Sequence, residues 1–143
     1  MTQDIAPIDG IDGVFAADPS APEHLVDICE LREEVQAKYA AVAERPHDEF
    51  HFHTGRFVAE RCRYDLDAVD ALPEEAVESF AGVGNPFEIR PLEAGEKVID
   101  LGSGAGTDSF LAADWVGSEG HVIGIDMTQE MLAKSRSTAE AMG

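Results

Sequence analysis

The sequence predicts an α/β fold in which parallel strands are joined by crossover helices. The first observation is a short apolar run at 98–101, which has the length of a buried parallel strand. The second is the glycine-rich turn at 102–106 that follows this run. The third is a helical stretch at 107–116 followed by another apolar run at 121–125, which ends in Asp126. Together these segments form one β-α-β unit.

The glycine-rich turn predicts a site for a ligand that contains a nucleoside. Glycine lets the backbone turn sharply and come close to a ligand, and the helix start at Thr107 presents free N–H groups. Asp126 follows Gly106 by about 20 residues, which suits a carboxylate that accepts hydrogen bonds from both ribose hydroxyls.

The spacing of the glycines distinguishes this turn from a dinucleotide-binding turn. The dinucleotide pattern is G-x-G-x-x-G, whereas here the third glycine comes one position early and Thr107 stands where that pattern has its last glycine. Asp100 precedes the turn, where its carboxylate would repel a pyrophosphate but suit an ammonium and a sulfonium. S-adenosylmethionine is therefore favoured, and a dinucleotide oxidoreductase is disfavoured.

The same stretch resembles motif I of the class I methyltransferases, and its surroundings are similar to the arsenite methyltransferase family. The resemblance rests on DLGSGAGTD at 100–108 and on GHVIGIDMT at 120–128. Upstream it includes LPEEAV at 72–77 and GNP at 84–86. It covers roughly residues 64–143.

The resemblance implies a Rossmann-like class I methyltransferase fold and an S-adenosylmethionine-dependent enzyme that acts on a small molecule. It implies that Asp126 holds the ribose, that Asp100 holds the methionine ammonium and that Met127 packs on the adenine. No catalytic residue can be named, and no resident metal is expected. The candidate cofactor-binding residues are Asp100, Gly102, Ser103, Gly104, Gly106, Asp126 and Met127.

The methyl acceptor is left open by the sequence. Arsenite methyltransferases bind trivalent arsenic through several cysteine thiolates, which are soft ligands for a soft metalloid. This chain has only Cys29 and Cys62, and neither falls on a recognisable arsenic-binding motif. A small organic acceptor is at least as well supported, and a quinone- or lipid-precursor C-methyltransferase is a close rival. A non-catalytic cofactor-binding module is the alternative from another class.

The composition narrows the partners of the chain. Its 29 acids and 10 bases give a net charge of −19, which argues against binding to nucleic acid or to anionic membrane surfaces. Only three of the bases are lysine, and such an acidic surface suggests the proteome of a halophile, where salt screens the self-repulsion. No signal peptide or membrane-spanning stretch is visible, so we expect a cytoplasmic protein.

The length predicts an incomplete domain. A methyltransferase of this class needs about six or seven strands, and only two are visible in 143 residues. We therefore expect a truncated, N-terminal part of a longer enzyme that lacks a complete active site, with an unpaired sheet edge that allows a homodimer. The expected divisions are a mobile acidic arm at 1–19, a helical lid or cap at 20–91 and the start of the cofactor-binding domain at 92–143.

The first expected element is an amphipathic helix. Ser20 and Glu23 resemble a capping box at its start, and it should end before Pro46. In related methyltransferases an N-terminal helical segment covers the cofactor, which makes Tyr39 a candidate contact. Cys29 lies beside the apolar face, so we expect it to be buried.

Three histidines follow within seven residues, at His47, His51 and His53. In an extended segment His51 and His53 would point to one side. The favoured interpretation is a polar loop with packed or solvated histidines. An acid/base or lid function near the substrate comes second, and a divalent-metal site is the least supported because no ligand spacing here is diagnostic.

The remaining elements are short. A helix is expected at 56–63, then a link, then a helix that opens at Pro73 and is stopped by the glycines at 82 and 84. Its buried side should hold Ala76, Val77 and Phe80. Thr128 can cap the last helix, whose common face should comprise Met131, Leu132, Ser135, Ala139 and Met142.

Overall fold

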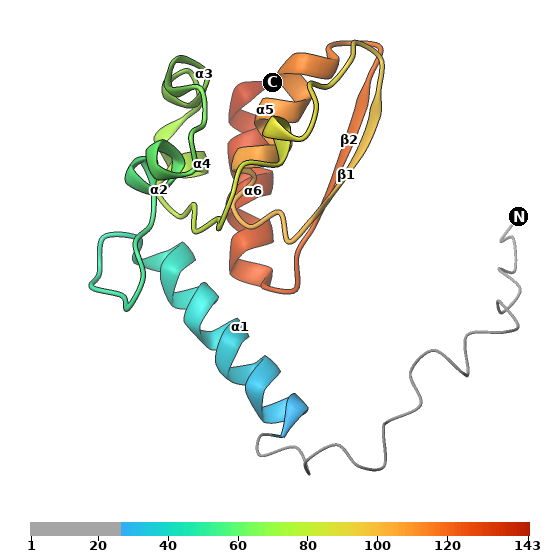
Figure 1. The fold of residues 1–143 in the computed structure, drawn as a ribbon. Coiled ribbons are helices and arrows are strands. Elements are labelled where there is room, and N and C mark those ends of the chain that lie inside the picture. The colour runs from blue at the N-terminus through green and yellow to red at the C-terminus, as the bar shows by residue number, and fades with distance from the viewer. Residues whose placement is uncertain (1–26) are drawn as a thin grey trace, which may run out of the picture.

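The structure, a computed structural model, describes residues 27–143 (Figure 1). The predicted arm at 1–19 and the predicted cap at Ser20 lie outside this range. Within it, no helix has the length and the apolar composition needed to cross a membrane. The predicted boundary near residue 92 falls in the segment between a short 3-10 helix and the first strand.

Helix α1 (Ile28–Glu44) begins at Ile28, directly after its N-cap residue Asp27. The Asp27 carboxylate accepts hydrogen bonds from the backbone N–H groups of Cys29 and Glu30, at 2.7 and 3.2 Å, which caps the helix. Figure 1 shows the start of α1 pointing away from the other helices and from the strands. The predicted burial of Cys29 is therefore wrong, because this cysteine lies in the exposed first turn, and the buried residues of α1 come at its other end.

Three short α-helices and one 3-10 helix follow α1. Two of the α-helices are shorter than the sequence predicts, and the third is not predicted at all. The predicted link before Pro73 contains a helix capped by Asp65, whose side chain accepts a hydrogen bond from the N–H of Asp67 at 3.0 Å. The helix after Pro73 ends at Val77, well before the glycines expected to stop it. The bounds are α2 (Arg56–Arg61), α3 (Leu66–Asp70), α4 (Glu74–Val77) and the 3-10 helix η1 (Pro86–Glu88).

The short helices share one apolar core with the β-α-β unit. Tyr64 and Val69 are buried in it, together with Leu111 from the unit's first helix. Phe80 and Phe87 pack against this cluster, and both rings meet Tyr64 edge-on. Because these contacts join distant parts of the chain, the helical segment is held against the unit that carries the glycine turn.

The predicted β-α-β-α unit is confirmed. Strand β1 (Lys97–Leu101) and strand β2 (His121–Ile125) are parallel and in register from Lys97 opposite His121 to Leu101 opposite Ile125. Helix α5 (Thr107–Val116) connects them, and helix α6 (Gln129–Met142) follows. The order is that of a Rossmann-like unit.

Helices α5 and α6 cover one face of the two-stranded sheet and lie between it and the short helices (Figure 1). The other face carries apolar side chains that remain exposed, with Ile99 at 64% and Leu101 at 78% of their full accessible surface, and Ile123 and Ile125 beside them. Among the described residues each strand pairs only with the other. The homodimer through this edge stays a prediction.

The buried side of α6 differs from the predicted face. Met131 and Thr138 are buried, whereas Ala139 is exposed and Met142 keeps 48% of its surface accessible. Lys134, on the side of α6 that faces the short helices, donates hydrogen bonds from its ammonium to the Glu78 carboxylate and to the Ser79 hydroxyl.

Candidate functional site

The glycine turn is fastened to the end of β2. The N–H groups of Gly102 and Ser103 both donate to the carbonyl oxygen of Ile125, at 2.7 and 3.0 Å. The N–H of Gly104 donates to Asp126 Oδ2 at 2.8 Å. The turn and Asp126 therefore meet at the carboxyl ends of the two parallel strands, where ligands bind in open α/β sheets.

Asp126 is oriented by backbone groups on both sides. Its Oδ1 accepts a hydrogen bond from the N–H of Thr128 at 2.8 Å, while Oδ2 accepts the one from Gly104. Thr128 occupies the cap position of α6, but its own side chain makes no capping hydrogen bond, so the predicted cap function of that side chain is wrong. Each carboxylate oxygen keeps further acceptor capacity for a ligand hydroxyl.

Gly106 allows the start of α5 to pack closely against α6. Its φ is +100°, and a Cβ there would lie 2.6 Å from Phe110 Cε2 and 2.7 Å from Ser135 Oγ. Glycine at this position lets α5 begin against α6. At Gly102, by contrast, an added Cβ would meet no atom within 4 Å, so bare backbone faces open space at the start of the turn.

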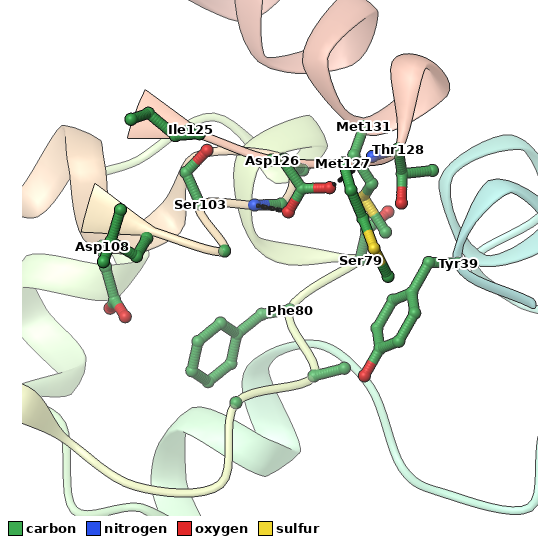
Figure 2. Close-up of a pocket in the computed structure, with 16 residues that line it drawn as sticks. Tyr39, Ser79, Phe80, Ser103, Asp108, Ile125, Asp126, Met127, Thr128 and Met131 are labelled. Atoms are coloured by element: carbon green, nitrogen blue, oxygen red, sulfur yellow. Dashed lines mark hydrogen bonds between the residues drawn. The ribbon is translucent and has the colours of Figure 1, made fainter. Parts of the chain in front are cut away.

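A cavity of about 600 Å³ opens beside the turn (Figure 2), within the usual size range of ligand pockets. Its walls come from four parts of the chain, namely Tyr39 of α1, the segment 79–82, the turn with the start of α5, and the residues from the end of β2 into α6. Tyr39, the predicted contact from the first helix, is among the lining residues.

The predicted cofactor-binding residues separate into two groups. Those that line the cavity are Gly102, Ser103, Gly104, Asp126 and Met127. Asp100 and Gly106 do not line it. The Asp100 carboxylate accepts a hydrogen bond from Ser109 Oγ of α5 at 2.6 Å, on the face of the sheet that α5 covers. The contact of Asp100 with a cofactor stays a prediction.

Asp108 lines the cavity and was not among the predicted site residues. Tyr64 Oη lies 2.8 Å from Asp108 Oδ1 and 3.1 Å from the carbonyl oxygen of Gly84. Burial raises the pKa of Asp108 to about 6, the hydrogen bond from Tyr64 opposes this shift, and the charge of Asp100 adds to it. Burial also raises the pKa of Tyr64 well above its usual range, so the phenol stays a donor.

Asp108 closes the DLGSGAGTD stretch, and this place in the first turn of α5 was the one signal available for it. Phe80 and Met131 also line the cavity. Neither stands in a motif, so no local pattern could have identified them.

The three predicted histidines do not form one cluster. His47 Nε2 lies 3.4 Å from Glu78 Oε2, beside a second cavity of about 440 Å³, and with Glu74 these groups could approach a common ion. His51 is exposed, and the His53 ring packs edge-on against Phe57 at 4.9 Å. Among the described residues, the acid/base and metal interpretations of all three histidines therefore lack a shared site.

Comparison with known proteins finds that the chain is similar to methyltransferases. Residues 92–143 match the family described as a methyltransferase domain. The arsenite methyltransferase of Halobacterium salinarum is 51% identical over 78 residues, which are 54% of this chain and 20% of that protein. Aklanonic acid methyltransferase of a Streptomyces species is 40% identical over 68 residues, or 47% of this chain and 31% of that protein.

A solved structure is also similar, that of an arsenic(III) S-adenosylmethionine methyltransferase from Chlamydomonas reinhardtii. It is 41% identical, the match covers 52% of this chain and 24% of that one, and the TM-score is 0.47. The chain thus spans less than a third of the length of each of these relatives.

Proposed function

We propose that this chain, which resembles the class I S-adenosylmethionine-dependent methyltransferases, binds S-adenosylmethionine in the cavity beside the glycine turn and contributes to methyl transfer to a small molecule. One observation carries the proposal: the Asp126 carboxylate meets the turn at the rim of that cavity, held by the N–H of Gly104. If a nucleoside binds there, the Asp126 carboxylate can contact its ribose. The backbone of the glycine turn can contact the group attached to the ribose.

Each part of the site has a proposed task. The remaining lone pairs of Asp126 accept hydrogen bonds from the ribose hydroxyls. The backbone of Gly102 and Gly104 lies along the methionyl part, because both glycines line the cavity without a side chain of their own. Met127, with 45% of its surface exposed, packs against the adenine.

The cofactor, when bound, supplies an electrophilic methyl group on a sulfonium. Transfer of that group needs the acceptor, the methyl carbon and the sulfur in line, so the chain's contribution is alignment and the exclusion of water. Tyr39 and Phe80 border the cavity from α1 and from the segment after α4. Their rings are suited to shield the reacting centre from solvent.

The proposal defines the acceptor only as a small molecule. The curated relatives act, by name, on arsenite and on aklanonic acid, a metalloid and an organic compound. Within the described residues neither cysteine lines the cavity, and the Cys62 thiol lies 3.7 Å from the carbonyl oxygen of Gly82. These residues therefore offer no thiolate for trivalent arsenic in the cavity, and we favour an organic acceptor.

Calorimetric titration with S-adenosylhomocysteine in concentrated KCl tests the proposal. We expect saturable binding with a Kd of about 10–100 μM, corresponding to roughly −6 kcal/mol, and no binding of NADH. Tighter binding of NADH than of S-adenosylhomocysteine would favour the dinucleotide alternative. A folded chain that binds neither compound would contradict the proposal.

We further propose that the chain works at high salt. The net charge of −19 implies strong self-repulsion in dilute buffer, and the first relative named above comes from Halobacterium. Raising KCl from 0.1 to 2 M should raise the midpoint of thermal unfolding by at least about 5 °C, because salt screens exposed charges. Circular dichroism measures it, with glycerol of equal osmolality as control. An unchanged midpoint would count against a halophilic origin.

A further inference from the structure

Asp108 lines a part of the cavity that is not occupied by the proposed contacts of the nucleoside with Asp126 and Met127. Figure 2 shows Asp108 and Met127 on opposite sides of Asp126. If the adenine lies against Met127 and the ribose against Asp126, the rest of the cofactor extends toward Asp108. The end of that remaining part is the methionyl group, which carries an ammonium.

The surroundings of Asp108 suit a cationic ligand. Its carboxyl is half-buried in the first turn of α5, and Tyr64 fixes it through the 2.8 Å hydrogen bond to Oδ1. The described part of the chain places no basic side chain in an ion pair with it. Asp100 adds a second negative charge nearby. Ionised and desolvated, such a carboxylate is costly unless a cation joins it.

We propose that Asp108, rather than Asp100, receives the α-ammonium of the cofactor's methionyl group, with Tyr64 as the positioning residue that holds the carboxylate. This inference rests on the proposed function. It differs from the sequence-based assignment, which names Asp100. The Asp100 carboxylate accepts a hydrogen bond from Ser109 and does not line the cavity, whereas Asp108 lines it. The specificity would be for a nucleoside that carries a cationic amino-acid tail.

The test compares two ligands on one conservative variant, Asp108→Asn. S-adenosylhomocysteine carries the ammonium, and 5′-methylthioadenosine lacks the whole amino-acid group. The variant should bind S-adenosylhomocysteine about 10- to 100-fold more weakly than the wild type does, which is the range for one charge-assisted hydrogen bond. Its affinity for 5′-methylthioadenosine should stay within about twofold, because the amide still accepts the hydrogen bond from Tyr64.

Three results would overturn the inference while leaving the proposed function intact. The first is equal weakening of both ligands by Asp108→Asn, which would indicate a purely structural role. The second is a loss for S-adenosylhomocysteine that appears in Asp100→Asn instead. The third is a much larger loss for S-adenosylmethionine than for S-adenosylhomocysteine, which would assign the carboxylate to the sulfonium. If the wild type binds none of these ligands, the proposed function fails, and this inference with it.

Stability measurements separate binding from folding. The folded chain holds the proton of Asp108 more tightly than the unfolded chain, since the folded pKa is about 6 against an ordinary 3.8. The stability that this group contributes is therefore lost as the pH rises through about 6. Ligand-free Asp108→Asn should unfold at a midpoint about 5 °C above the wild type at pH 8, and the gain should shrink toward pH 5. Asp114→Asn, exposed on the same helix, is the matched control and should change neither midpoint nor affinity.

Discussion

Replacing Asp126 by alanine should weaken the binding of S-adenosylhomocysteine by at least about 100-fold. Two charge-assisted hydrogen bonds to the ribose hydroxyls would be lost, and together they are worth about 3 kcal/mol or more. The same carboxylate holds the N–H groups of Gly104 and Thr128. Its removal therefore also frees the turn that lies along the cofactor.

Calorimetry on three variants and two ligands measures this effect. Asp126→Asn keeps one oxygen acceptor and should fall between the wild type and Asp126→Ala. Asp114→Ala removes an equal charge from the exposed side of α5 and should bind as the wild type does. A 2′-deoxy analogue should bind the wild type about tenfold more weakly but should show no further loss in Asp126→Ala. An equal penalty for the analogue in both proteins would show that Asp126 does not contact the ribose.

Replacing Lys134 by methionine should lower the free energy of unfolding by about 3 kcal/mol. The ammonium is largely buried, with 14% of the side chain exposed against 18% for its partner Glu78. It donates to the Glu78 carboxylate, to the Ser79 hydroxyl and to the carbonyl oxygen of Ala43. These groups come from α6, from the end of α4 and from α1, so one side chain joins three elements. Without it the Glu78 carboxylate keeps its burial but loses its main cation.

Urea unfolding at constant KCl measures this loss. Lys38→Met is the control, because Lys38 is exposed on α1, and it should change the free energy of unfolding by less than about 0.5 kcal/mol. Adding Glu78→Leu to Lys134→Met should recover part of the stability, since no unpaired charge is then buried. If the two lysine variants lose equal stability, the contact at Lys134 is not the link between these elements.

Lys134 also contacts a residue that lines the cavity. Ser79, one of its acceptors, belongs to the segment 79–82 that forms a wall of the cavity. The hydroxyl of Ser79 lies 3.3 Å from the carbonyl oxygen of Val42 in α1. The contact thus connects the orientation of α6 to the wall that faces the proposed cofactor.

The β-α-β unit could be predicted from the sequence almost to the residue. The helix at 107–116 and the strand at 121–125 have the predicted bounds. The first strand begins one residue before the predicted start, at Lys97. The signals that determine them are local, because an apolar run, a glycine turn and a helical period lie within a few residues of each other. The meeting of Asp126 with the turn follows equally from the parallel order of the strands.

The helical segment before the unit was less predictable. The sequence pattern does not predict helix α3, although Asp65 provides an ordinary cap, because five residues are too few to show a helical period. The periodicity places Cys29 beside an apolar face, but the first half of α1 buries no residue. In both cases the local pattern was compatible with several structures, and packing against distant residues decided between them.

By itself the sequence determined the order of the elements, the position of the glycine turn and the acid at the end of β2. The tertiary structure alone decided which carboxylates face the cavity. Asp100 and Asp108 flank the same turn, but strand pleating directs Asp100 under α5, whereas the start of α5 brings Asp108 to the cavity wall. Tyr64, which fixes Asp108, stands 44 residues earlier in the chain. A contact over such a separation arises from the packing of the helical segment on α5, and no pattern along the chain encodes it.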